Sequence, residues 1–385
     1  MPLKTKTKLK CLSLFANAGI AEAYFEKIGI EVVVANELLE ERAKFYRHLY
    51  PLADMLAGDI TCDRVRAEIV EKAKKLKVDF VIATPPCQGM SRHGKRDAYD
   101  ERNQLIYYAI DVIKKVRPKF ILLENVPRQL VTQIDHKGKR VLIPEYIKEE
   151  LAPGYRIYPE TIFNSADFGV PQSRKRCIYR MVRKDVPVEW DAPKPIGRAI
   201  TLKDAIGDLP SLDPLVREEN KRNFFPDFAR KRQAGLEVSK WHYPPIHGWK
   251  HVNWMLHTPS GKTAFENKIF YPQKDGGKPI SGRISTYKRF SWDKPANTIT
   301  QNNGVISSAI CVHPGRLLRD NGTEKGRVYS DPRTLTIYEL LLVSSLPPKW
   351  DIPEWASEKL IRNVIGEGIP PMLVKRIMDG LVAKL

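Results

Sequence analysis

Cysteine is scarce in this chain of 385 residues. The five cysteines, an odd number, are scattered and form no Cys-x-x-Cys pair; they are Cys11, Cys62, Cys87, Cys177 and Cys311. A disulfide framework or a structural zinc site needs paired, closely spaced cysteines. We therefore expect neither, and a reducing compartment such as the cytoplasm fits this usage best.

Long hydrophobic runs are absent as well. No apolar stretch reaches the roughly 18 residues that a membrane span requires. The segment from Lys4 to Lys10 carries lysine at alternate positions, and it lacks the apolar region of a signal peptide after its charges. We expect a soluble, cytoplasmic protein that is not exported and has no membrane partner.

Acidic residues are too few to balance the basic ones. Lysine and arginine number 64 against 45 aspartates and glutamates, a formal net charge of +19 at pH 7. Neutralising the phosphates of a polyanion releases counter-ions, so this excess favours a nucleic-acid partner. A solvated basic surface is the alternative that charge alone leaves open.

The first half of the chain alternates short apolar runs with helical stretches. Strands are predicted at 11–15, 31–35, 80–83 and 120–123, with helices such as 42–49 and 104–116 between them. This alternation is typical of a doubly wound, mostly parallel α/β sheet. The length and a hydrophobic content of 42% are sufficient for two domains with buried cores.

The character of the sequence changes after about residue 186. Residues 187–292 are rich in proline, glycine and aromatic residues, as expected of a separate, irregular domain. Near the C-terminus, Leu373, Ile377, Leu381 and Val382 form the apolar face of a helix that should pack back on the sheet. We predict a first domain of residues 1–185 plus 355–385, and a smaller domain of residues 186–354.

Polar residues follow the predicted strands at one sheet edge. The turn Phe15-Ala16-Asn17-Ala18-Gly19 leads into a helix predicted at 21–25, Glu37 ends the second strand, and Asp59-Ile60 lies near a further strand end. Carboxylates so placed can accept ribose hydroxyls and an adenine amino group. The pattern Gly-x-Gly-x-x-Gly is absent, which disfavours a diphosphate. Each carboxylate alone is as well explained by a helix cap or a surface role, but together they favour an adenosine-type cofactor.

Cys87 follows the third apolar run on a turn stiffened by Pro85 and Pro86. The two prolines fix φ and remove two backbone donors, so the strand ends there and the thiol is held at the carboxyl edge of the sheet. Ligands bind at that edge in open α/β sheets. This placement predicts a nucleophile, with the polar loop 89–103 able to close over a substrate. A buried, inert cysteine is the alternative.

Two further groups are expected at the same edge. Glu124 follows the fourth strand and is a candidate proton donor, because burial would raise its pKa. Arg174 and Arg176 alternate on an extended segment and so point to one face, where two guanidinium groups suit an anion or a carbonyl edge. The solvated face of an edge strand is the alternative for these arginines.

In their order along the chain, these segments resemble the DNA (cytosine-5) methyltransferase family, of the bacterial restriction-modification type. Pro86-Cys87-Gln88, Glu124-Asn125-Val126 and Gln172-x-Arg174-x-Arg176 look like its three catalytic motifs. Segments 292–300, 313–316 and 333–340 resemble its later conserved blocks. The resemblance runs from Leu14 to the C-terminal helix and excludes most of residues 187–280.

The resemblance implies a Rossmann-like fold that uses S-adenosylmethionine to methylate C5 of a cytosine flipped out of duplex DNA. Cys87 would add to C6, Glu124 would protonate or hydrogen-bond N3, and Arg174 would hold O2. Arg176 and Gln88 belong to the same implied catalytic set. An RNA-directed enzyme that methylates transfer RNA and a non-catalytic DNA-binding regulator on the same fold are the rival hypotheses.

The resemblance also implies a cofactor site, a DNA-reading region and partners. The implied cofactor residues are Phe15, Ala16, Ala18, Gly19, Ile20, Asn36, Glu37, Asp59, Ile60, Pro86, Leu105, Glu367 and Ile369. Residues of about 187–290 stand where the family keeps its target-recognition region, and their basic and aromatic side chains suit a duplex groove. Double-stranded DNA is the expected partner of a monomer, with a cognate restriction endonuclease as a further possibility.

Four histidines of this region, His242, His247, His251 and His257, have no acidic or cysteine partners at ligand spacing. Groove contact or packing is therefore favoured over metal binding, and no metal site is predicted.

The sequence departs from the family pattern at three places. Where the first block usually reads Asp-Leu-Phe-Ala-Gly-x-Gly-Gly, the chain has Ser13-Leu14-Phe15-Ala16-Asn17-Ala18-Gly19-Ile20, without the acid and two of the glycines. The final block, usually Gly-Asn-(Ser or Ala)-Val-Pro, reads Gly366-Glu367-Gly368-Ile369-Pro370. We expect Glu367 to face the α-ammonium or sulfonium region of the cofactor. Met90 replaces a phenylalanine, and we expect little effect because the two side chains are similar in volume.

Overall fold

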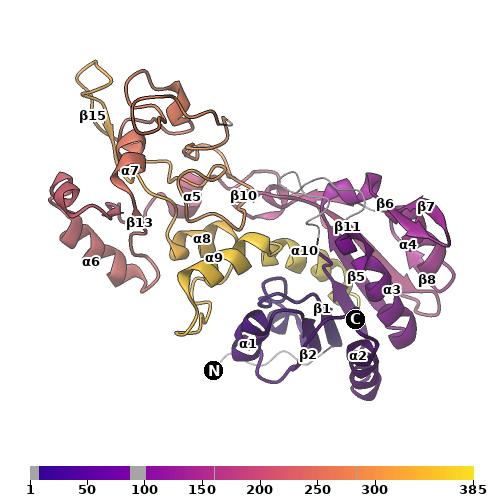
Figure 1. Ribbon diagram of the computed structural model, residues 1–385. Helices are drawn as coiled ribbons and strands as arrows, with labels where there is room; N and C mark the ends of the chain where they lie inside the picture. The colour runs from indigo at the N-terminus through magenta and orange to yellow at the C-terminus, as the bar shows by residue number, and fades with distance from the viewer. Residues whose placement is uncertain (1–7, 87–100, 160, 283) are drawn as a thin grey trace.

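The computed structural model describes residues 8–86, 101–159, 161–282 and 284–385 (Figure 1). Its centre is an eight-stranded sheet in the order β3-β2-β1-β4-β5-β11-β8, with β9 beside β11. The strands are β1 (Leu9–Leu14), β2 (Ile30–Glu37), β3 (Asp54–Ala57), β4 (Phe80–Ala83), β5 (Phe120–Asn125), β8 (Tyr155–Ile157), β9 (Thr161–Asn164) and β11 (Lys175–Arg183). Strands β1 to β5 pair in parallel, and β11 alone runs the other way, because it pairs antiparallel with β5, β8 and β9. The predicted, mostly parallel sheet is confirmed.

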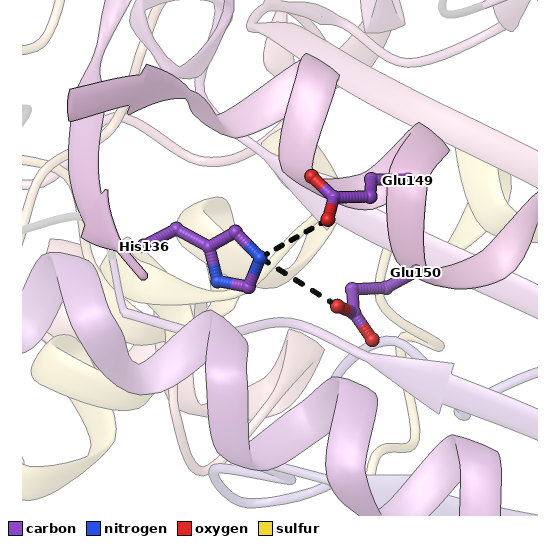
Figure 2. A group of neighbouring side chains, drawn as sticks. All are labelled: His136, Glu149 and Glu150. Atoms are coloured by element: carbon purple, nitrogen blue, oxygen red, sulfur yellow. Dashed lines mark hydrogen bonds and ion pairs between the residues drawn. The ribbon is translucent and has the colours of Figure 1, made fainter. Parts of the chain in front are cut away.

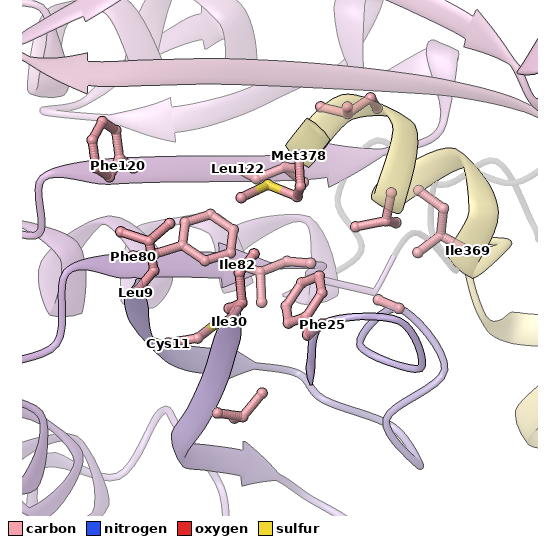
Figure 3. Close-up of a cluster of buried hydrophobic side chains, with 14 of the residues drawn as sticks. Leu9, Cys11, Phe25, Ile30, Phe80, Ile82, Phe120, Leu122, Ile369 and Met378 are labelled. Atoms are coloured by element: carbon pink, nitrogen blue, oxygen red, sulfur yellow. The ribbon is translucent and has the colours of Figure 1, made fainter. Parts of the chain in front are cut away.

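Helices cover both faces of the sheet because successive strand residues point to opposite sides. Leu12 and Val81 pack on one face with helices α2 (Asp63–Lys75), α3 (Leu105–Val116) and α4 (Ile143–Leu151). Cys11 and Phe80 pack on the other face with α1 (Glu40–Leu49) and the C-terminal α10 (Pro371–Val382), as Figure 3 shows for α10. The sheet is therefore doubly wound, with a hydrophobic core on each side.

The predicted C-terminal helix is confirmed as α10. Leu373, Ile377 and Leu381 are fully buried against the sheet. Burying an aliphatic side chain of this kind contributes about 1.5–3 kcal/mol. Trp190 anchors the same helix, because its indole N–H donates to the carbonyl of Ile377 at 2.9 Å. The end of the chain thus completes the core of the first domain.

The helix predicted at 21–25 is wrong. Residues 20–25 form turns joined by bonds from residue i+3 to residue i, and only a short 3₁₀-helix, η1 (Glu26–Ile28), precedes β2. Phe15, Asn17 and Gly19 have φ of 58°, 50° and 73°, in the left-handed region. Such residues turn the chain tightly, and an α-helix cannot include them. The few residues left before β2 do not form a regular helix.

The residues of the predicted small domain form short elements. Figure 1 shows it at one side of the molecule, with α8, α9 and α10 running between it and the sheet. Its elements are α5 (Leu202–Ile206), β12 (Leu215–Val216), α6 (Phe228–Val238), β13 (Ile246–His247), α7 (Trp249–Leu256), β14 (Ala296–Asn297), β15 (Leu317–Arg319), β16 (Val328–Tyr329) and α8 (Ile337–Val343), followed by α9 (Glu358–Glu367). No helix in the described part of the chain is long and apolar enough to cross a lipid bilayer.

The division of the chain at residues 185 and 354 stays a prediction. Helices α8 and α9 share one hydrophobic cluster with Ala18, Ile20 and Phe45 of the first domain. This cluster joins the small domain to the turn that follows β1. The position of the small domain is therefore coupled to the predicted cofactor turn.

A buried ionic network supports the small domain. The Arg333 guanidinium pairs with Asp331 and Glu339 at 2.8 Å, and all three side chains are almost fully buried. Removing one member of such a network leaves an uncompensated buried charge, which costs about 3–5 kcal/mol. Arg333 and Glu339 of segment 333–340, which resembles a later block of the family, thus have a structural role in the small domain.

Candidate active site

The carboxyl ends of the central strands meet at one edge, and side chains tie their turns together. The Thr84 hydroxyl, just after β4, donates to the carbonyl of Phe15 after β1 at 3.1 Å. The Asn125 amide, at the end of β5, donates to the carbonyl of Pro85 at 3.2 Å. The turn that precedes Cys87 is thus held from both sides by hydrogen bonds.

Cys87 and Gln88 lie outside the described residues, as does most of the loop 89–103. The structure describes the turn up to Pro86, which is half-buried. The predicted nucleophile is therefore placed only by the residues that lead to it, and its role stays a prediction.

Glu124 and Arg176 form a buried ion pair at this edge. Strands β5 and β11 pair antiparallel and bring the two residues side by side, with Arg176 Nε 2.6 Å from Glu124 Oε1. Their side chains are only 9% and 10% exposed. Burial raises the pKa of the Glu124 carboxyl, while the guanidinium groups of Arg176 and Arg174 oppose the rise. The pair places a carboxyl group that holds a proton more readily than usual next to a positive charge.

Arg174 is engaged elsewhere. Its guanidinium donates to the carbonyl of Ile299 at 2.7 Å and to the carbonyl of Glu367 at 2.8 Å. These contacts tie a loop of the small domain to the end of α9. The two arginines thus have different tasks, and Arg176 rather than Arg174 contacts the predicted acid. Strand alternation alone does not distinguish them.

The predicted cofactor turn is fixed by Glu37. One oxygen of its buried carboxylate accepts the N–H of Asn17 at 2.9 Å, and the other accepts the N–H of Leu39 at 3.0 Å. Residue 19 must be glycine, because a Cβ at this position would clash with the ring of Tyr50. The Tyr50 hydroxyl also donates to the carbonyl of Gly19 at 2.7 Å.

Several predicted cofactor residues serve the core instead of an open surface. Ala16 and Ile369 are buried in the cluster under α10, and Ala18 and Ile20 are buried against α8 and α9. Leu105, at the first turn of α3, packs partly against the cluster on the other face. Contacts of these residues with a cofactor would have to involve backbone atoms or exposed edges.

A second group lies near the ends of β2 and β3. The Asn36 amide donates to the carbonyls of Leu56 and Gly58 at 2.9 and 3.0 Å and so fixes the turn that carries Asp59. Asp59 is exposed, whereas Ile60 is buried. A carboxylate open to solvent beside an ordered turn is available to a ligand.

Leu38 and Arg42 at this edge were not singled out by sequence reasoning, and Asn17 was named only for its place in the turn after β1 and as a departure from the family pattern. Leu38, directly after Glu37, is 59% exposed although it is apolar. The Asn17 amide donates to the carbonyl of Val364 at 3.0 Å, while its buried Oδ1 has no partner among the described residues. Arg42 of α1 pairs with Glu367 of α9 at 2.5 Å. Of these residues, only Leu38 could have been suspected from the sequence, because an apolar residue there directly follows the acid that ends a predicted strand.

The histidines of the small domain do not gather into a ligand set. His242 and His247 are buried and hydrogen-bonded to residues 334–336, and burial lowers the pKa of both. His251 and His257 pack against aromatic rings. Hydrogen bonds and ring packing engage all four histidines in this structure.

A different group of possible ligands lies next to α4. His136, at the end of β6 (Gln133–His136), has its Nε2 3.4 Å from Glu149 and 3.7 Å from Glu150 (Figure 2). In the described ranges this is the one group with the spacing of metal ligands. Lys137 and Lys114 already pair with its two carboxylates at 2.7 and 2.6 Å. An ion-pair cluster accounts for the group.

Known proteins resemble this chain over nearly its whole length. The family model described as C-5 cytosine-specific DNA methylase matches residues 9–383. The Type II methyltransferase M1.HgaI of Avibacterium volantium is 42% identical over 97% of this chain and 98% of its own length. The Type II methyltransferase M.XorII of Xanthomonas oryzae is 34% identical over 95% of this chain and 82% of its own length.

A solved structure shares the fold at low identity. It is described as a DNA modification methyltransferase encoded within an E. coli prophage, with a TM-score of 0.67, 20% identity and coverage of 98% of this chain and 99% of that one. The family match spans both domains and contains each motif of the sheet edge. The chain therefore belongs to the C-5 cytosine-specific DNA methylase family and is a DNA (cytosine-5) methyltransferase.

Proposed function

We propose that the chain methylates C5 of a flipped-out cytosine within a specific duplex sequence, as a restriction-modification enzyme, through a covalent bond from Cys87 to C6. The observation that carries the proposal is the buried Glu124–Arg176 pair beside the anchored turn that ends in Pro86. A stacked base cannot be attacked on either face, so the cytosine must leave the duplex. The two Type II relatives support the restriction-modification assignment.

In the proposed reaction, the Cys87 thiolate forms a bond to C6 and the electron pair of the C5–C6 double bond moves toward N3 and O2. Glu124 donates its proton or a hydrogen bond to N3, and the Arg176 guanidinium stabilises the charge at O2. The electron pair would then form the bond from C5 to the methyl group while the bond from that methyl group to the sulfonium sulfur breaks, with S-adenosylhomocysteine as the product. Loss of the C5 proton to water restores the double bond and breaks the bond to Cys87.

Arg176 takes the place that the sequence assigned to Arg174 in this scheme. Arg176 contacts Glu124 directly, whereas both terminal nitrogens of Arg174 bind backbone carbonyls. Arg174 is therefore proposed as a residue that positions the small domain against α9. Arg176 is proposed as the catalytic arginine.

The residues at the edge fit S-adenosylmethionine, which supplies an electrophilic methyl group when bound. The buried Oδ1 of Asn17 lacks a partner in the described structure, and an α-ammonium group would provide one. Glu37 can accept ribose hydroxyls with its remaining lone pairs. Exposed Leu38 offers an apolar surface to an adenine ring, and Asp59 can accept the adenine amino group.

Glu367 reaches the same edge in an ion pair. Its carboxylate and the Arg42 guanidinium are about one fifth exposed, at 22% and 17%. An amino-acid zwitterion carries the complementary charges, so the pair suits the methionine portion of the cofactor. Glu367→Ala should weaken S-adenosylmethionine binding more than twofold in calorimetry. An affinity unchanged within twofold would refute the role of Glu367.

Residues of the small domain are proposed to read the DNA. Lys221 lies 6.0 Å from the ring centroids of Phe224 and Trp249, which are tilted against each other at 4.4 Å, and Arg222 and Arg232 are exposed. Basic side chains interleaved with aromatic rings are typical of nucleic-acid surfaces. Lys231 is less available, because it pairs with Asp213 at 2.7 Å.

Two experiments separate the hypotheses about function. Bisulfite sequencing of plasmid DNA from cells that express the chain should reveal one methylated sequence. Tritium transfer from S-adenosylmethionine in a competition between duplex DNA and transfer RNA should favour DNA, and preferential labelling of transfer RNA would support the RNA-directed alternative. A non-catalytic regulator would transfer no label to either substrate.

Two further expectations concern partners. Analytical ultracentrifugation should show a monomer, and a cognate endonuclease would cut the same sequence.

A further inference from the structure

Glu22 is a buried acid that the proposed reaction does not use. It lies in the turns that follow the predicted cofactor turn, and it is only 2% exposed. The hydroxyl of Ser13, on β1, donates to Glu22 Oε1 at 2.5 Å. The second oxygen, Oε2, is buried without a partner among the described residues. A charged carboxylate in such a place would be poorly solvated.

Among the residues that the structure describes, the groups that face Glu22 provide no positive charge. They are Ser13 and Cys11 of β1, Tyr46 of α1, and Tyr50 directly after α1. A charge on Glu22 raises the pKa of Cys11, Tyr46 and Tyr50, so all three lie within its electrostatic reach. These side chains are neutral near pH 7, and none of them stabilises an anion as an arginine or a lysine would.

The same two elements hold the cofactor turn. Ser13 sits near the end of β1, in register with Ala35 of β2 and Ile82 of β4. On the other side, the Tyr50 ring packs against Gly19 and its hydroxyl binds the carbonyl of Gly19. Glu22 therefore lies between the strand that begins the turn and the helix that supports it.

Ser13 stands where the family pattern has aspartate, so the acid at this point of the chain comes from a different residue. We propose that Glu22 is a positioning residue for residues 15–20: its neutral carboxyl packs between β1 and the end of α1 and holds the turn in place, and a charge on its buried, unpartnered Oε2 loosens this packing even though Ser13 still donates to Oε1. The proposal rests on the proposed function, because cofactor binding is what the turn would serve. It predicts that cofactor affinity falls as the proton leaves Glu22.

The direction of the pH effect follows from burial. Burial raises the pKa of Glu22 to about 7, and the Ser13 hydrogen bond partly opposes this. An unfolded chain releases the same proton near 4.3. The folded state thus binds the extra proton between about pH 4.3 and 7, so the contribution of Glu22 to stability becomes less favourable as pH rises through this window. Above about pH 7 the contribution is constant, and the carboxylate is charged in both states.

The first test needs no cofactor. Thermal unfolding of the full chain is followed from pH 4.5 to 8.5 for the wild type, Glu22→Gln, Ser13→Ala and the exposed-acid control Glu26→Gln. The wild type should lose melting temperature relative to Glu22→Gln between about pH 4.5 and 7, with no further change above. Ser13→Ala should extend the loss to higher pH, because it removes a bond that lowers the pKa. Parallel profiles of wild type and Glu22→Gln would overturn the proposal.

The second test measures S-adenosylhomocysteine binding by calorimetry at pH 6, 7 and 8. Wild-type affinity should fall at least threefold from pH 6 to 8, whereas Glu22→Gln should change less than twofold. A wild-type affinity independent of pH would overturn the proposed effect on the turn. If Glu22→Gln does not fold, the upward shift of the transition in Ser13→Ala decides the matter. Absence of binding in all variants at every pH would instead contradict the proposed function, while the unfolding profiles would still report on Glu22.

Discussion

At the scale of single residues, the geometry distinguishes two arginines that the sequence treats alike. Arg176 contacts a buried acid, and Arg174 joins the carbonyls of Ile299 and Glu367. The first contact concerns charge at the reacting base, and the second concerns the arrangement of the two domains. Substitution of the two residues should therefore affect different properties of the enzyme.

Arg176→Ala should reduce the rate of methyl transfer by about 10²-fold or more, as is typical when a stabilising donor is removed. Arg174→Ala should mainly lower the free energy of unfolding, because two buried carbonyls lose their donors at about 1–3 kcal/mol each. Single-turnover tritium transfer and urea unfolding of both variants measure the two effects. Equal rate losses at unchanged stability would contradict this division.

Glu124 gives a second prediction at this scale. Its pKa is raised by burial, and the proposed step uses its protonated form. The rate of methyl transfer at saturating substrates should therefore decline as pH rises through the folded-state pKa of Glu124. Glu124→Gln should lower the rate by about 10²–10⁴-fold and remove this decline. The pH profile of single-turnover rates in both proteins measures the effect; a decline that persists in Glu124→Gln would assign it to another group.

At the scale of elements, α10 completes one core of the sheet although it comes from the end of the chain. Its apolar face was readable from the sequence, because residues at helical spacing carry large aliphatic side chains. The partner of that face was readable too, since a doubly wound sheet needs helices on both sides. Short β-branched runs in the sequence likewise indicate the parallel strands of the sheet.

Ile377→Ala should lower the free energy of unfolding by about 2–5 kcal/mol, because the side chain is fully buried against the sheet. Lys375→Ala is the control on the same helix, since it removes an ion pair with Asp379 that is worth less than about 1 kcal/mol. Urea unfolding midpoints measure the difference. A comparable loss in both variants would show that the helix contributes through its surface.

The turn after β1 shows why other features could not be predicted. Left-handed backbone is common for asparagine, as at Asn17, but has no residue signature at Phe15, and the apolar spacing of residues 21–25 favoured a helix that does not form. The burial of Glu22 and its contact with Ser13 depend on packing against α1. The pair of Arg42 and Glu367 joins residues 325 positions apart. Contacts between distant segments decide these features, and local pattern does not report them.

At the scale of the whole molecule, the excess of positive charge should govern DNA binding. The formal net charge is +19, and each neutralised phosphate contributes a slope of about −0.9 to log K against log salt concentration. Fluorescence anisotropy with a duplex should thus show affinity that falls steeply between 50 and 200 mM salt, on the order of 10³-fold for six contacts. S-adenosylhomocysteine affinity is the control and should change far less. A salt-independent duplex affinity would contradict electrostatic binding.

The central claim is that Cys87 attacks a cytosine which Glu124 and Arg176 activate. A duplex that carries 5-fluorocytosine at the methylated position tests it most directly. The fluorine on C5 cannot be removed by a base as the C5 proton is, so the bond to Cys87 is not broken and the covalent adduct persists. With S-adenosylmethionine present, the wild type should form an adduct that survives denaturing electrophoresis. Cys87→Ser should form none while it still binds the duplex. Absence of the adduct in an active wild type, or methyl transfer by Cys87→Ser, would contradict the account.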